Sequence, residues 1–173
     1  SDDEALTITS LDGAPAWVAN ESNRLVITTA GAQLGATTFS AVVADPGGLS
    51  TSASVTVAIR NQLPLAVGDI IDVTDGRSST ADLTANDSDP DSSDDLAISE
   101  LPATPSFSIT FPNGEPGTVT LQSDARSVLV DPGDGRGSTT FSYRIRDADG
   151  GISAPATVTV NAPRLNQAPT VTS

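Results

Sequence analysis

The chain has 173 residues and a formal net charge of −14 at pH 7, with no cysteine, no histidine and arginine as its only basic residue type. The negative charge excludes nucleic acid and anionic membrane surfaces as partners, and no apolar run approaches the ~20 residues that a membrane-spanning helix needs, so no membrane insertion is expected. Without histidine, lysine or cysteine there is no disulfide framework, no imidazole base, no histidine-bound zinc and no Schiff-base lysine, so we expect no enzyme.

Short alternating runs of apolar residues with threonine or serine predict β-strands throughout the chain, and no window has a sustained helical period. In chain order these runs are 6–9, 25–28, 38–43, 53–57, 70–73, 118–121, 127–130, 140–145 and 157–160. Strands at this spacing, separated by glycine and proline, are typical of an antiparallel β-sandwich.

Part of the sequence is repeated. Phe39-Ser40 recurs as Phe141-Ser142, and Asn61-Gln62-Leu63-Pro64 recurs as Asn166-Gln167-Ala168-Pro169. The spacing of about a hundred residues is the size of an immunoglobulin-type domain. The sequence therefore predicts tandem copies of one domain.

The repeat divides the chain into three predicted segments. Residues 1–60 form a first Ig-like repeat that lacks its first two strands, because nothing in it matches Leu65–Asn86. Residues 61–163 form a second, complete Ig-like repeat, and residues 164–173 form a linker and the start of a third. The edge left without the missing strands is a place where another chain can pair.

The second repeat carries an acidic loop, Thr84–Asp95, with Asp87, Asp89 and Asp91 at every second position. These carboxylates repel one another unless a cation lies among them, and Ca²⁺ takes six to eight oxygen ligands from aspartate, asparagine and backbone carbonyls. The EF-hand pattern does not fit, since Ser92 stands where its turn glycine belongs. Alternatively, the loop is solvated and its aspartates make local turns.

Four motifs of the second repeat occur together in one known family. They are Ala66-Val67-Gly68-Asp69, Leu83–Asp91, Phe141-Ser142-Tyr143 and Asp147-Ala148-Asp149-Gly150-Gly151. With them the chain resembles the bacterial cadherin-like, immunoglobulin-like tandem repeats of large surface proteins and adhesins. The resemblance implies an all-β fold of tandem immunoglobulin-like (cadherin-like) Greek-key β-sandwiches, stiffened by calcium, in a secreted or cell-surface protein. The family often has two acidic residues where this chain has Gly68-Asp69.

In such a sandwich three chain segments meet at the end where the repeat begins: the incoming linker, the loop after the second strand and the hairpin after the penultimate strand. We expect them to bring oxygen ligands for Ca²⁺ to the junction between repeats. The predicted ligands are Asn61, Asp69, Asp87, Asp89, Asp91, Asp147 and Asp149. A hairpin turn that uses aspartate and glycine for its backbone geometry explains 147–151 equally well.

The sequence thus predicts a non-enzymatic structural and adhesive module, whose partners are the neighbouring repeats of its own chain and a surface protein or glycan. A ligand- or carbohydrate-binding accessory domain of a secreted enzyme is the second possibility, which an exposed Trp17 beside a groove would favour. A core position is the simpler expectation for that tryptophan. A metal-free spacer is the third. Tyr143 is expected in the core, with its hydroxyl bonded to nearby backbone.

Overall fold

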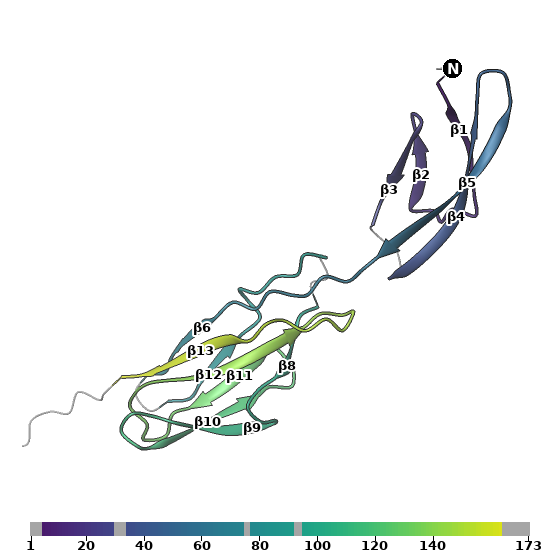
Figure 1. Cartoon of the computed structure of the whole chain (residues 1–173). Helices are drawn as coiled ribbons and strands as arrows, with labels where there is room; N and C mark the ends of the chain where they lie inside the picture. Colours follow the sequence, from purple (N-terminus) through teal and green to yellow (C-terminus); the bar gives the residue numbers. More distant parts are fainter. Residues whose placement is uncertain (1–4, 30–33, 75–76, 92–94, 164–173) are drawn as a thin grey trace, which may run out of the picture. The chain divides into compact units, whose positions relative to one another are not determined.

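The chain folds into two compact units, Ser1–Asn61 and Gln62–Ser173. The computed structural model describes residues 5–29, 34–74, 77–91 and 95–163. All regular elements of the described residues are β-strands (Figure 1), so the predicted all-β class is confirmed. Nowhere in the described ranges is there a helix of the length and apolarity that crossing a bilayer requires.

The second unit is a Greek-key β-sandwich of two four-stranded sheets, with strand orders β6-β13-β12-β8 and β7-β11-β10-β9. Its strands are β6 (Asp69–Asp72), β7 (Ser79–Asp82), β8 (Ala97–Glu100), β9 (Ser106–Thr110), β10 (Pro116–Leu121), β11 (Ser127–Asp131), β12 (Gly137–Arg146) and β13 (Ala156–Ala162). Alternation of apolar and polar residues along each strand turns one face of each sheet toward the other.

The core of the second unit lies between these two sheets. On β13, Val158 and Val160 are 0% exposed, while Thr157 between Ala156 and Val158 faces solvent. Phe111, 2% exposed, packs at one end of the core against a glycine. A Cβ atom on Gly135 would lie 2.0 Å from Phe111 Cδ2, so the aromatic ring occupies the space that any other residue at this position would need.

The first and last strands of the second unit run in parallel, which differs from the antiparallel sandwich predicted from the strand spacing. β6 and β13 pair from Val158↔Asp69 to Asn161↔Asp72. The two strands are not joined by a hairpin but by the rest of the domain, so no tight turn forces them to be antiparallel. Because they share a direction, the chain enters the unit at one end and leaves it at the other (Figure 1).

The first unit contains a three-stranded sheet of order β1-β4-β5 and a separate two-stranded hairpin, β2-β3. Its strands are β1 (Thr7–Asp12), β2 (Val18–Glu21), β3 (Arg24–Ile27), β4 (Gly35–Ala44) and β5 (Ser50–Ile59). Asparagine amides of the hairpin fasten it to β1: Asn20 Nδ2 donates to Ile8 O at 2.9 Å and Asn23 Nδ2 donates to Leu6 O at 2.7 Å. The described residues bury few apolar side chains here, namely Val18, Phe39 and Ala41.

Candidate functional site

The loop that follows β7 lies against the chain segment that leads into β6. Leu65 and Ser88 exchange two backbone hydrogen bonds, of 2.8 and 3.2 Å, and Val67 N–H donates to Asp87 Oδ1 at 2.7 Å. This pairing gathers carboxylates at the end of the second unit where the chain enters. We call this group the acidic pole: Asp69, Asp87, Asp89 and Asp91.

Tyr143 lies beneath the acidic pole and connects the segments that form it. Its side chain is 1% exposed, and its hydroxyl lies 2.9 Å from both Val67 O and Leu83 O. The same hydroxyl is 3.2 and 3.3 Å from the two carboxylate oxygens of Asp87. The predicted core position is therefore confirmed, but the backbone partners are distant in sequence, 76 and 60 residues away, rather than local.

Asp69 and Asp87 are held close to each other in a poorly solvated place. Burial raises the pKa of both carboxyl groups, and the Asp69 pKa is raised further by the charges of Asp87 and Asp82. Hydrogen bonds from Tyr143 oppose the shift in both groups. Burial raises the pKa of Tyr143 above its usual range, and the nearby carboxylates of Asp69 and Asp87 raise it further. Among the described residues, none of the groups that shift these pKa values is basic.

Asp91 holds the start of the second unit in place. Its carboxylate accepts hydrogen bonds from the backbone N–H of Gln62 and, at 3.0 Å, from the Gln62 side-chain amide. Asp89 Oδ1 accepts the Asp91 backbone N–H at 2.7 Å, which shapes the turn around Pro90. Two carboxylate oxygens are buried without a hydrogen-bond partner, Asp69 Oδ2 and Asp89 Oδ2. Both oxygens therefore retain lone pairs that a ligand could use.

The remaining predicted ligands are placed differently. Asp147 is 4% exposed, and its Oδ1 accepts the Gly151 backbone N–H at 2.8 Å while its own N–H donates to Gly151 O at 3.1 Å. Asp149 lies exposed on the turn between them. These contacts are those of a hairpin turn. Asn61 is half-buried as the last residue of the first unit.

The acidic pole can be tested against the needs of a calcium ion. Within the described ranges, no three acidic side chains come close enough together to hold a metal ion as they stand. Two features do suit a cation: a pair of desolvated carboxylates in Asp69 and Asp87, and the unpartnered oxygens of Asp69 and Asp89. The donor chemistry therefore fits Ca²⁺, but backbone carbonyls, amide oxygens or water must complete the coordination.

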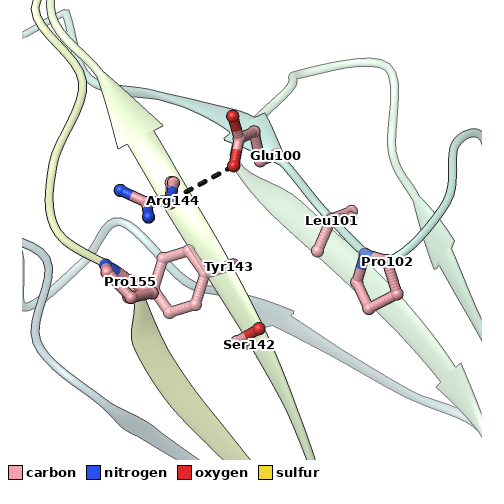
Figure 2. Close-up of a pocket in the computed structure, with 7 residues that line it drawn as sticks. All are labelled: Glu100, Leu101, Pro102, Ser142, Tyr143, Arg144 and Pro155. Carbon is pink, nitrogen blue, oxygen red and sulfur yellow. Dashed lines mark ion pairs between the residues drawn. The ribbon is translucent and has the colours of Figure 1, made fainter.

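A small surface cavity of about 140 Å³ lies over β8 and β12, between Glu100, Ser142 and Pro155 (Figure 2). Arg144 Nε and Glu100 Oε2 form an ion pair of 3.1 Å across it, with both side chains partly solvated. The aromatic residue that lines it, Tyr143, has its ring in the core. The cavity therefore offers no exposed aromatic face on which a sugar could stack.

Trp17, the single tryptophan, is half-buried. Its carbonyl accepts the Thr28 backbone N–H at 2.8 Å, which places it beside the end of β3. It lies in the first unit, whereas the cavity over β8 and β12 belongs to the second. Trp17 is thus neither fully enclosed in a core nor fully exposed.

Several solved structures are similar to the chain, at low sequence identity. The human desmocollin-1 ectodomain shares 12% identity at a TM-score of 0.36, over 94% of this chain and 35% of that one. Chicken VE-cadherin EC1-2 shares 13% identity at a TM-score of 0.35, over 95% of this chain and 86% of that one. An endo-fucoidan hydrolase of glycoside hydrolase family 107 shares 16% identity at a TM-score of 0.37, over 91% of this chain. The chain spans only 27% of that enzyme's length.

No protein of curated function matches the chain. A family model described as "Bacterial Ig domain" matches residues 61–161, which are the greater part of the chain and nearly all of the second unit. The match agrees with the two-sheet sandwich and with the immunoglobulin-like resemblance of the sequence motifs. The chain therefore belongs to the bacterial Ig domain family.

Proposed function

We propose that the chain is a non-enzymatic structural and adhesive repeat module of a larger secreted or cell-surface bacterial protein. The observation that carries this proposal is the parallel pairing of β6 with β13, because it sends the chain in at one end of the second unit and out at the other. Domains with this arrangement can follow one another in a line without folding the linkers back. Bacterial Ig domains are typically non-catalytic, and the chain lacks histidine, lysine and cysteine.

Small-angle X-ray scattering tests the spacer role on chains that carry one, two and three copies of residues 61–163. Each added copy should increase the maximum dimension by a similar increment, roughly the length of one sandwich. A maximum dimension that stays nearly constant from two copies to three would mean that the copies pack side by side, and would contradict the proposal.

Calcium binding at the acidic pole is the second part of the proposal. The support comes from two half-buried carboxylates, Asp69 and Asp87, that lie near each other without a basic partner among the groups that shift their pKa values. It comes also from the unpartnered oxygens of Asp69 and Asp89. We assign the central ligands to Asp69, Asp87 and Asp89, with Asn61, Asp91 and Asp147 as secondary ligands. The exposed Asp149 is left out of this set. When bound, Ca²⁺ would neutralise these charges and tie the start of β6 to the loop after β7, so that the link between consecutive repeats becomes stiffer.

Calorimetric titration with Ca²⁺ tests this second part. Extracellular calcium modules bind at about 10⁻⁴ to 10⁻³ M, so we expect weak, saturable binding that Asp69→Asn weakens and the exposed Asp149→Asn leaves nearly unchanged. At a hundredfold excess over Kd, one site adds about 2.7 kcal/mol to the free energy of unfolding. Equal melting with calcium and with a chelator would make the module a metal-free spacer.

A carbohydrate-binding accessory domain is the alternative class. The half-buried state of Trp17 gives it little support, because a sugar-binding tryptophan exposes one ring face. Retention of the chain on insoluble polysaccharide, abolished by Trp17→Ala but not by Phe39→Leu, would favour this alternative over the spacer.

A further inference from the structure

The sheet of the first unit corresponds strand by strand to one sheet of the second unit. The order β1-β4-β5 matches β8-β12-β13, and β4 and β12 each begin at a glycine with positive φ, Gly35 at 117° and Gly137 at 101°. The hairpins that follow are closed in the same way. Leu49 N–H donates to Asp45 Oδ1 at 2.9 Å, as Gly151 N–H does to Asp147 Oδ1 at 2.8 Å.

The second unit shows what covers the outer edge of the last strand. There β6 pairs with β13 in parallel, from Val158↔Asp69 to Asn161↔Asp72, and Val73 N–H continues the ladder to Asn161 O at 2.9 Å. Close approach begins at Gly68, where a Cβ atom would lie 2.7 Å from Thr157 O. A strand that pairs with this edge therefore needs glycine one position before it.

In the first unit the equivalent edge is the outer side of β5. β5 pairs with β4 along its full length, and of the residues that the structure describes none pairs with its other side. Val55 and Val57 stand where Val158 and Val160 stand in the second unit. The first pair is only half-buried, whereas the second pair is 0% exposed.

Nothing along β5 protects this edge from pairing. Natural edge strands are usually guarded by charged side chains, proline, a bulge or short length. β5 is 10 residues long, its sequence STSASVTVAI has neither charge nor proline, and its register with β4 runs without interruption. It therefore presents a straight row of free N–H and C=O groups beside partly exposed valines.

We propose that the outer edge of β5 is a binding site for an extended peptide strand of the β6 type, which adds to the sheet in parallel. The peptide carries inward apolar side chains at alternate positions after a glycine, as Ile71 and Val73 do after Gly68. The backbone ladder supplies affinity, and an inward isoleucine over Val55 and Val57 supplies selectivity. Transferring the register of the second unit places Asp72 of the peptide opposite Ala58. The site depends neither on calcium nor on the spacer role.

Disulfide trapping tests the site in the full chain, which has no native cysteine. A synthetic peptide of residues 64–74 carrying Asp72→Cys is mixed with the Ala58→Cys chain and oxidised. Asn161→Cys is the matched control, because it is the same position on the edge that β6 already covers. We expect a mixed disulfide with Ala58→Cys at least about tenfold more abundant than with Asn161→Cys.

Two further arms make the outcome decisive. A peptide with its cysteine at Ile70 should cross-link to Ala58→Cys poorly, because it is two residues out of register, and a peptide with Gly68→Val should bind weakly. The unmodified peptide should raise the denaturant midpoint reported by Trp17 but not the one reported by Tyr143. Equal trapping at Ala58 and Asn161, or no shift of the Trp17 midpoint, overturns the proposal. So does sedimentation of the chain alone as a dimer linked through Ala58→Cys, which would place a second copy on this edge.

Discussion

One hydroxyl group, that of Tyr143, connects the acidic pole to the core. It carries a single hydrogen but lies within 3.3 Å of two backbone carbonyl oxygens and the carboxylate of Asp87. It can donate to only one of these acceptors at a time, so the others depend on weaker contacts or on a proton held by Asp87. Burial raises the pKa of Asp87, whereas the hydrogen bond from Tyr143 lowers it.

Tyr143→Phe should destabilise the second unit by about 1–3 kcal/mol, because it leaves buried acceptors without their donor while the ring still fills the core. Urea denaturation followed by far-UV circular dichroism measures the change. A denaturation midpoint equal to that of the wild type would mean that the hydroxyl contacts contribute nothing to the folded state.

The raised pKa values of Asp69 and Asp87 predict a pH dependence of definite sign. The folded unit holds these protons more tightly than the unfolded chain, so their contribution to the free energy of unfolding is greatest below about pH 4 and falls as the pH rises through the folded pKa values. The Asp69→Asn variant has no carboxyl group to ionise at this position, so it avoids that part of the fall in the free energy of unfolding. We therefore expect the variant to gain stability relative to the wild type between about pH 4 and pH 7.

Melting curves across that pH range provide the measurement, with the exposed Asp149→Asn as the matched control. The control should follow the wild type at every pH. A difference between Asp69→Asn and the wild type that does not change with pH would show that Asp69 ionises equally easily in both states.

At the scale of single elements, the sequence predicted the strands whose apolar residues alternate, and those were confirmed. It missed four strands, β2, β7, β8 and β9, although β9, Ser-Phe-Ser-Ile-Thr, does alternate. The sequence of β7, Ser-Thr-Ala-Asp, has no such alternation. That strand is held by its ladder with β11, between partners that the sequence does not reveal. The acidic loop was recognisable from its spacing of aspartates, but the clamp between Gln62 and Asp91 was not. It depends on two segments 29 residues apart meeting in one register, which no local pattern encodes.

The contact between Phe111 and Gly135 also belongs to this scale, because it closes one end of the sandwich. Gly135→Ala should cost about 1–3 kcal/mol, since the added Cβ must displace a packed ring. In a Phe111→Leu background the same substitution should cost less, because the smaller side chain leaves room. Urea denaturation followed by Tyr143 fluorescence measures the wild type, the two single variants and the double variant of this double-mutant cycle. Equal costs in both backgrounds would show that the ring is not the obstacle.

At the scale of the whole molecule, the two units differ in how much of a core they have. Among the described residues the second unit encloses an extended cluster between two sheets, whereas the first buries Val18, Phe39 and Ala41. Since buried apolar area is the main source of folding free energy, the first unit should be the less stable of the two.

The chain carries its own probes for this difference, because its single tryptophan lies in the first unit and its single tyrosine in the second. In urea, the fluorescence of Trp17 should change at a lower concentration than that of Tyr143. Val160→Ala, in the second core, should lower the Tyr143 midpoint and leave the Trp17 midpoint in place. Coincident transitions would mean that the units unfold together.

The parallel contact of β6 with β13 has a mechanical consequence. Tension applied through the two ends of the second unit pulls these neighbouring strands along their length in opposite directions. Their shared backbone hydrogen bonds are then sheared together instead of opening one after another as in an unzipped hairpin. A protein strung from such units would resist stretching until this one patch of four residue pairs slips.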